Sequence, residues 1–171
     1  FVAIGPGGLA KVFDGLGNSG SEFSIPFNPQ AVHALGEGSG FVVVGGGGSD
    51  DIFAQIYNAQ GEQQGSNIRV NQSLEGSQSA PEVATLEDGG FVVTWQADDS
   101  SSSGVYGRVF NNDGTARSDE FQLNTFENSN QFQNDIVGLA DGGFVSVWTS
   151  FGQDGDAFGI VGRKFDDFGN A

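Results

Sequence analysis

Apolar residues in this chain occur in short runs, and the runs recur in the same order about every fifty residues. The clearest run is written twice, as EDGGFVVTW (Glu87–Trp95) and ADGGFVSVW (Ala140–Trp148), with a weaker copy, GEGSGFVVVG, at Gly36–Gly45. Successive side chains of a strand point to opposite faces, and both faces of Phe91–Trp95 are largely apolar. The pattern therefore predicts strands covered on both sides, and no helical period extends over a useful length.

Similar segments surround each copy of this run. Those that follow it read GVYGRVFNNDG (Gly104–Gly114), GIVGRKFDDFG (Gly159–Gly169), DIFAQIYNAQG (Asp51–Gly61) and GLAKVFDGLG (Gly8–Gly17). Further downstream come SEFSI (Ser21–Ile25), SNIRV (Ser66–Val70) and DEFQL (Asp119–Leu123). Upstream of the run lie AVHAL (Ala31–Leu35), EVATL (Glu82–Leu86) and DIVGL (Asp135–Leu139). Each unit thus holds four segments rich in β-branched and aromatic residues, which predicts four strands.

Two kinds of turn punctuate each unit. An Asp-Gly-Gly turn separates the first two strands in two copies, and Gly there adopts positive φ at little cost. Between the third and fourth strands an aromatic is followed by Asp or Asn, two residues and Gly, as in Phe110–Gly114. The Asx side chain can bond the backbone ahead while Gly takes the left-handed position. Both turns predict antiparallel hairpins.

A repeated four-stranded antiparallel unit with buried inner strands is typical of a β-propeller blade. We therefore expect an all-β, propeller-like fold of repeated four-stranded antiparallel sheets, in a single repeat domain over residues 1–171. Its expected parts are a partial unit (1–28), two full units (30–71 and 79–124) and a second partial unit (134–171). A β-trefoil and an open repeat array remain alternatives, because four blades is the lower limit for a closed propeller.

The two outer units lack partner strands. Phe1–Ile4 reads as a second strand without a first, and Phe158–Phe165 reads as a third strand without a fourth. Because unpaired edges attract other strands, we expect completion from outside this sequence, by a second copy or by the rest of a longer chain. Internal closure, with Phe1–Ile4 beside Phe158–Phe165, is the competing expectation. The chain begins with Phe1 and contains no Met, which favours a processed product or part of a longer protein.

The composition excludes several classes of function. The formal net charge is −16 with only six Lys and Arg, so no basic footprint exists for nucleic acid or anionic lipid. Cysteine is absent, which excludes disulfides, thiolate metal sites and thiol catalysis. No run of about eighteen apolar residues is present, so no membrane insertion is expected.

The segments LADGGFVSVWTSFGQDGDAFGIVGRKFDDFG and DEFQLNT resemble a repeat of very large secreted bacterial proteins. These are the hemolysin-type calcium-binding or adhesin-like proteins, whose repeats look like those of integrin-type propellers. The resemblance is good over Ser79–Ala171 and loose over Phe1–Gln78. It implies an extracellular or cell-surface location, a structural or adhesive role, and calcium.

Acidic loops between the second and third strands are the candidate metal site. Calcium takes six to eight oxygen ligands, and carboxylates in flexible loops can supply several of them. The alternative interpretation is that these are solvated loop acids, and both interpretations stay open. The residues are Asp50, Asp51, Asp98, Asp99, Asp154 and Asp156.

Long polar residues recur two positions before the aromatic that ends the third strand. They either pack their stems along that ring or form a ring of polar heads that binds an anionic or polyhydroxy ligand. We favour the first interpretation. The residues are Lys11, Gln55, Arg108 and Arg163.

The remaining candidates are interpreted as core residues. His33 is the only histidine, and its counterparts Ala84 and Val137 are apolar, so we expect a packed imidazole. Trp95 and Trp148 lie at the centres of equivalent strands, and we expect them to be buried. No spacing suggests a Ser/His/Asp set.

These observations favour a non-enzymatic structural or adhesive repeat module of a secreted or cell-surface protein, with calcium stabilisation and self-assembly as further expectations. A carbohydrate-binding module, with glycans as partners, is the alternative. A hydrolase is the least supported class because no catalytic set is apparent.

Overall fold

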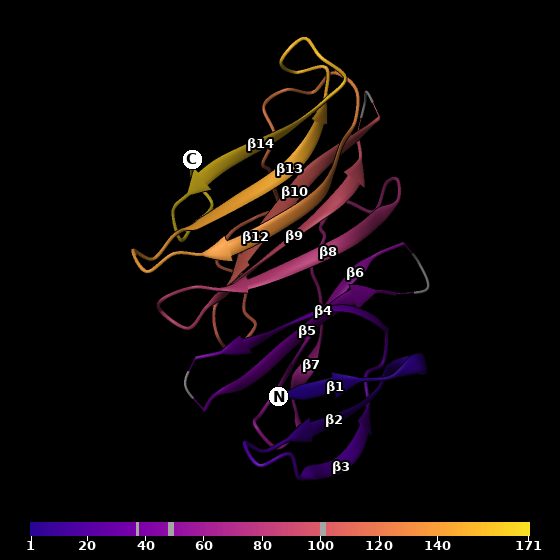
Figure 1. The fold of residues 1–171 in the computed structure, drawn as a ribbon, viewed down its shortest axis with the longest axis vertical. Coiled ribbons are helices and arrows are strands. Elements are labelled where there is room, and N and C mark those ends of the chain that lie inside the picture. Colours follow the sequence, from indigo (N-terminus) through magenta and orange to yellow (C-terminus); the bar gives the residue numbers. More distant parts are fainter. Residues whose placement is uncertain (37, 48–49, 100–101) are drawn as a thin grey trace.

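The structure is a computed structural model that describes residues 1–36, 38–47, 50–99 and 102–171. Its described residues form fourteen β-strands and one 3₁₀ turn, η1 (Pro6–Gly8). The strands make four antiparallel sheets, each with its strands in chain order (Figure 1). The expectation of an all-β, antiparallel fold is confirmed.

The strands of each sheet are consecutive in the chain. The first sheet holds β1 (Val2–Ile4), β2 (Leu9–Phe13) and β3 (Ser19–Ser24). The second holds β4 (Asn28–Leu35), β5 (Gly40–Gly46), β6 (Ile52–Tyr57) and β7 (Gln63–Arg69). The third holds β8 (Gln78–Thr85), β9 (Phe91–Asp98), β10 (Ser103–Phe110) and β11 (Phe121–Gln122). The fourth holds β12 (Gln131–Gly138), β13 (Phe144–Phe151) and β14 (Phe158–Phe165).

The repeated Gly-Phe pair opens equivalent strands. Phe41, Phe91 and Phe144 lie at the start of β5, β9 and β13, and each of these strands pairs with the strand before it and the strand after it. A Cβ on Gly90 would stand 2.7 Å from the carbonyl oxygen of Phe110, so the backbone approaches too closely for a larger residue. The sequence expectation that these segments are copies of one hairpin is confirmed.

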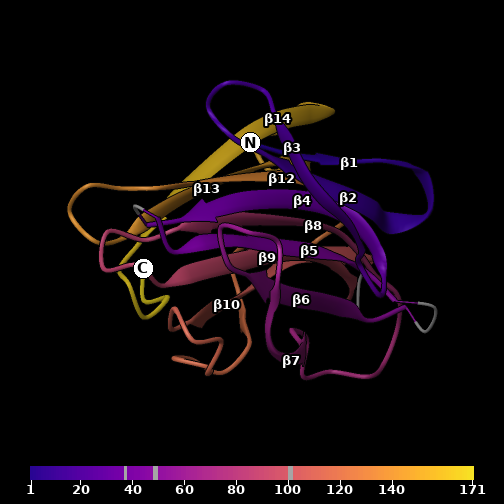
Figure 2. The same ribbon diagram turned by 90° about the horizontal axis from the view of Figure 1, so that it is seen from below.

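The four sheets follow one another in chain order along the long axis of the molecule (Figure 1), and in the view along that axis the neighbouring first strands β4, β8 and β12 overlap (Figure 2). Three hydrophobic clusters fill the spaces between them. The first cluster joins Ala10 and Ile25 to Tyr57, the second joins Val44 to Trp95, and the third joins Val92 to Trp148. Each inner sheet is therefore covered on both faces, as the two-sided apolar pattern predicts.

An aromatic pair recurs in every sheet: the residue at the start of β5, β9 or β13 stacks on the residue that ends the next strand, and in the first sheet Phe1, just before β1, stacks on Phe13 at the end of β2. The centroid distances are 4.7 Å for Phe1–Phe13, 5.2 Å for Phe41–Tyr57, 5.1 Å for Phe91–Phe110 and 5.0 Å for Phe144–Phe165. The last strand of the preceding sheet covers the pair: Phe23 on β3 lies 5.0 Å from Tyr57, and Phe121 on β11 lies 5.9 Å from Phe165. Each sheet thus completes the core of the next.

The ends of the stack stay open. Among the described strands, β1 pairs only with β2 and β14 pairs only with β13. The competing expectation of internal closure, with Phe1–Ile4 beside Phe158–Phe165, is therefore wrong. The three-stranded end sheets are separated by the two four-stranded inner sheets, so β1 and β14 lie at opposite ends of the stack (Figure 1).

Candidate interaction surface

Two arginines connect neighbouring sheets through the same geometry. Arg108 lies 5.4 Å from the ring centroid of Phe110, and its Nη1 donates to the carbonyl oxygen of Val70 at 3.1 Å. Arg163 lies 5.4 Å from the centroid of Phe165, and its Nη1 donates to the carbonyl oxygen of Leu123 at 3.2 Å. The side chains lie against the aromatic ring as expected, but it is the guanidinium head that lies over the ring, and this head bonds the preceding sheet instead of water. We call these two contacts the arginine ties.

The other two residues at this position also bond locally. Gln55 is fully buried, and its Nε2 donates to the carbonyl oxygens of Ile56 and Gln64 at 2.9 Å each. Lys11 lies 3.7 Å from a carboxylate oxygen of Glu22 on the neighbouring strand. The four heads therefore have separate partners, which gives no support to a common ligand-binding ring.

A pair of buried asparagines was missed by the sequence reasoning. Asn71 and Asn124 follow the fourth strands of the second and third sheets, and both are nearly fully buried. Their Oδ1 atoms accept from the backbone N–H of Ile52 at 2.9 Å and of Val105 at 2.8 Å. Each amide therefore fastens the start of the linker that follows it to the third strand of its own sheet. The signal was present in the sequence, because RVN and QLN occupy the same place in two units.

Arg117 forms another contact between sheets. It reaches Asp88 in the third sheet at 2.6 Å and Asp167 beyond the end of β14 at 3.5 Å. Burial acts to raise the pKa of Asp88, but the Gly90 N–H and the Arg117 guanidinium outweigh it and lower the pKa. The carboxylate is thus held in its charged form beside the guanidinium.

The acidic loops lie in different sheets, and their oxygens have partners in their own surroundings. Asp98 accepts from Ser77 N at 2.9 Å, Asp99 from Ser102 N at 2.8 Å and Asp51 from Asn71 Nδ2 at 2.8 Å. Asp154 accepts from Asp156 N at 3.2 Å and Asp156 from Ala157 N at 2.8 Å, while the carbonyl of Asp50 accepts from Gln78 N at 3.0 Å. Over the described ranges, no three His, Asp or Glu side chains gather in a group that could hold a metal ion. Calcium at these loops stays a proposal.

His33 is exposed, so the expectation of a packed core histidine is wrong. Its Nδ1 lies 3.1 Å from Thr85 Oγ1 and 3.2 Å from the carbonyl oxygen of Ala34. The strand that carries it, β4, contacts β8 of the next sheet, whereas the three-stranded first sheet has no counterpart of β4 to lie against it. Its counterpart Ala84 lies on β8, which has β4 and β12 as neighbours, and is buried.

Both tryptophans are buried, as the sequence predicts. Trp95 is 0% exposed and Trp148 is 2% exposed, which excludes them as sugar-stacking platforms. Trp95 Nε1 donates to Gln78 Oε1 at 3.0 Å. The counterpart of Gln78 is Gln131, whose Oε1 accepts from Asn124 Nδ2 at 3.1 Å instead.

The outer face of the fourth sheet carries apolar side chains in contact with solvent. Val137 on β12, Val147 on β13 and Ile160 on β14 are 56%, 36% and 74% exposed. Phe158 on β14 is exposed as well. Apolar groups gathered on one face of a sheet mark an interaction surface more often than scattered ones do. This outer face is the main candidate functional site.

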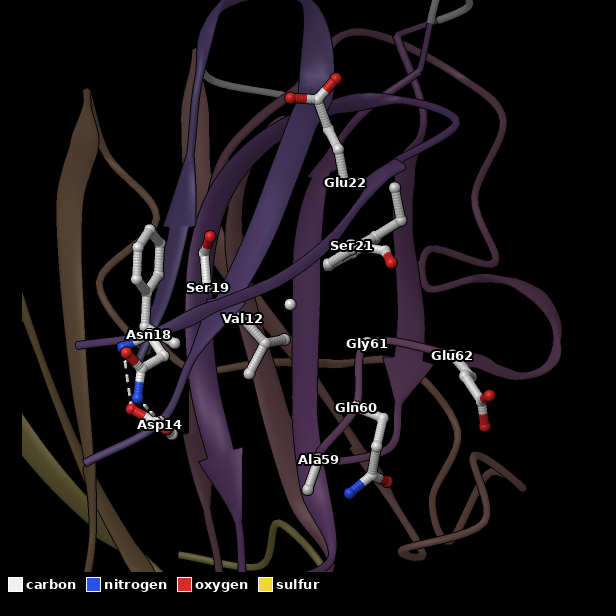
Figure 3. Close-up of a pocket in the computed structure, with 13 residues that line it drawn as sticks. Val12, Asp14, Asn18, Ser19, Ser21, Glu22, Ala59, Gln60, Gly61 and Glu62 are labelled. Atoms are coloured by element: carbon white, nitrogen blue, oxygen red, sulfur yellow. Dashed lines mark hydrogen bonds between the residues drawn. The ribbon is translucent and has the colours of Figure 1, made fainter. Parts of the chain in front are cut away.

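An open groove lies between the turn that joins β2 to β3 and the turn that joins β6 to β7 (Figure 3). Its volume is about 670 Å³, and its polar lining includes Asp14, Asn18, Glu22, Gln60 and Glu62. Asn18 Nδ2 donates to Asp14 Oδ2 at 2.9 Å, and this side-chain bond lowers the pKa of Asp14. The groove is the second candidate site.

No known protein family and no curated protein matches this chain. In the part of the chain that the structure describes, no helix is long and apolar enough to cross a membrane.

Proposed function

We propose that this chain is a structural or adhesive repeat module of a secreted or cell-surface protein, built to stack sheets on one another. The main support is that the polar residues that recur from sheet to sheet form hydrogen bonds within the stack. Arg108 and Arg163 bond the preceding sheet, and Asn71 and Asn124 fasten the linkers. Residues that the repeat keeps in place thus serve its own packing.

The stack is a propeller-like arc in this proposal. The first strands of successive sheets lie next to one another, with β4 against β8 and β8 against β12. Blades of a propeller likewise place one strand near a common axis. The resemblance to repeats of secreted calcium-binding or adhesin-like proteins supports the same location and role.

Calcium stabilisation is part of the proposal. Asp98 and Asp99 share one loop and Asp154 and Asp156 another, and hard oxygen donors of this kind suit calcium. Thermal unfolding with calcium, magnesium or a chelator tests it. A calcium-specific rise of the unfolding midpoint, reduced in Asp154→Asn/Asp156→Asn, is expected, and equal midpoints in all three conditions would contradict it.

Two measurements test the structural proposal: the stability of a variant without the arginine ties, and the binding of the intact chain to glycans. We expect the double variant Arg108→Met/Arg163→Met to lose stability in urea, because both arginine ties are removed. We expect the intact chain to show no selective binding on a broad glycan array. Selective binding of one glycan class, together with an unchanged urea midpoint in the double variant, would overturn the proposal.

A carbohydrate-binding module is the second candidate function, supported by the open groove of Figure 3. Its lining combines Phe13 with the exposed amide of Gln60 and the carboxylate of Glu22, which suits a polyhydroxy ligand. Glycan binding that is lost in Gln60→Ala and kept in the matched variant Gln72→Ala, outside the groove, would favour this candidate.

A further inference from the structure

Each sheet of the stack has two different faces. We call the face toward the preceding sheet the leading face and the face toward the following sheet the trailing face. The aromatic pair, such as Phe91 with Phe110, lies on the leading face, where the second cluster covers it. The trailing face of the same sheet carries Val92, which belongs to the third cluster. Every internal contact therefore joins a trailing face to a leading face.

The trailing face of the fourth sheet repeats residues that are covered elsewhere. The counterparts of Val147 are Ile4 on β1, Val44 on β5 and Thr94 on β9, each three residues after the repeated Phe. Ile4 packs in the first cluster, Val44 lies in the second, and Thr94 Oγ1 accepts from Asn134 Nδ2 of the fourth sheet at 2.9 Å. All three thus lie under the following sheet, whereas Val147 is exposed.

The leading face of the first sheet shows the reciprocal feature. Its aromatic pair is formed, but Phe1 is 76% exposed, whereas Phe41, Phe91 and Phe144 are buried. Leu9 on the same face is 45% exposed. Its counterparts Tyr106 and Val161 pack against the second and third clusters, so this position is covered in the third and fourth sheets.

We propose that the trailing face of the fourth sheet docks the leading face of the first sheet of a second copy of this chain. The inference rests on the proposed function, because it continues the stacking contact that the chain already makes three times. A second copy is the occupant because it carries, at its other end, the kind of face that each internal trailing face contacts. The contact is heterologous, so further copies can add to either end.

Electrostatics set the conditions for this docking. Each copy has a formal net charge of −16, so two copies repel one another at long range. Salt shortens the reach of that repulsion to about 8 Å at 0.15 M and about 3 Å at 1 M. The apolar contact is buried and is not weakened in the same way. We therefore expect association to increase with sodium chloride concentration.

The test is the mass in solution, measured by light scattering over a range of protein and salt concentrations. The chain has a mass of 17.8 kDa, and species larger than a dimer are expected at high salt. Val147→Asp removes the trailing face and Leu9→Asp removes the leading face, so each variant alone should remain a monomer. In an equimolar mixture the intact trailing face of Leu9→Asp can dock the intact leading face of Val147→Asp. The resulting heterodimer should grow no further, because both of its free faces carry a substitution. Leu74→Asp, an exposed site in a linker outside both faces, is the matched control and should assemble like the unchanged chain.

Three results would overturn the proposal. They are an unchanged chain that stays monomeric at every concentration and salt, a Val147→Asp variant that still assembles, and a mixture that gives no heterodimer. Assembly of Val147→Asp would identify pairing through the β14 edge, since this substitution on β13 leaves that edge intact. Tryptophan fluorescence checks that the variants fold, and Ile160→Asp, at a more exposed position, replaces Val147→Asp if that variant does not. A monomeric chain whose arginine ties still stabilise it would remove this inference and leave the proposed function standing.

Discussion

The third and fourth sheets have nearly the same sequence motif, yet equivalent side chains differ in their exposure to solvent. Val105 is 0% exposed in the third sheet, whereas its counterpart Ile160 is 74% exposed in the fourth. Val109 is buried, and at its place in the fourth sheet stands Lys164, which is exposed. The difference lies in the neighbour: the third sheet is covered by the fourth, and the fourth is covered on one face only. The same strand pattern therefore forms a core in one sheet and a surface in the other. Whether a neighbouring sheet covers a position decides how much its side chain contributes to stability.

The largest test of this comparison removes the tryptophans. Trp95→Ala and Trp148→Ala should each destabilise the chain by about 3–5 kcal/mol, because both side chains are buried. Trp95→Ala should cost more, since both faces of its sheet are covered and Gln78 loses the donor that it accepts from. Urea unfolding of the two variants gives the two values. A larger loss in Trp148→Ala would contradict the idea that coverage decides the contribution.

A smaller and more direct test truncates the paired aliphatic positions. Val105→Ala should cost about 2 kcal/mol, because its methyl groups are fully buried. Ile160→Ala should change stability by no more than about 0.5 kcal/mol in the monomer. The measurement is urea unfolding at low salt and low protein concentration, where association is weakest. Equal losses at both positions would mean that the fourth sheet is covered in solution even under those conditions.

The arginine ties give the next comparison. Arg108 donates to Val70 and also, through Nε, to the carbonyl oxygen of Ser118 at 3.1 Å, whereas among the described residues Arg163 donates to Leu123 alone. Arg108→Met should therefore cost about 1–2 kcal/mol and Arg163→Met less. Methionine keeps most of the stem, so the loss reports the guanidinium. Thermal unfolding with Arg69→Met, at an exposed arginine on β7, as the control for simple charge removal checks this order.

The smallest effect concerns the turns after the third strand. The end sheets use Asp14 and Asp166 there, and the inner sheets use Asn58 and Asn111. Hydrogen bonds from the Asn18 and Asn170 side chains lower the pKa values of Asp14 and Asp166. A lowered pKa in the folded state stabilises the chain above the unfolded value of about 3.9, and the gain disappears as the pH falls through the folded value.

Asp14→Asn and Asp166→Asn should therefore reduce the loss of stability below about pH 4 relative to the unchanged chain. The measurement is the urea midpoint at a series of pH values between 6 and 3. The other carboxylates titrate in both proteins, so only the difference between them reports on the turn. Parallel pH profiles would show that these turns do not contribute.

The repeat and its turns could be predicted from sequence because they depend on local chemistry. Gly90 and the residues from Asn111 to Gly114 carry their geometry in their own backbone and side-chain preferences. The exposure of His33 could not be predicted, because it depends on a neighbouring strand that the first sheet lacks. The same holds for the acidic loops: the spacing of Asp154 and Asp156 fixes one loop and says nothing about which other loops lie near it.

The way in which one sheet covers the aromatic pair of the next bears on the order of events during synthesis. Phe23 and Phe121 belong to sheets made earlier than the rings that they cover, Tyr57 and Phe165. A ribosome releases the chain from its N-terminus, so each emerging sheet meets a finished template. We expect nascent chains to gain protease resistance in steps of about fifty residues, one step for each sheet that leaves the exit tunnel. Proteolysis of chains stalled at successive lengths checks this, and a single late gain of resistance would show that the sheets fold only together.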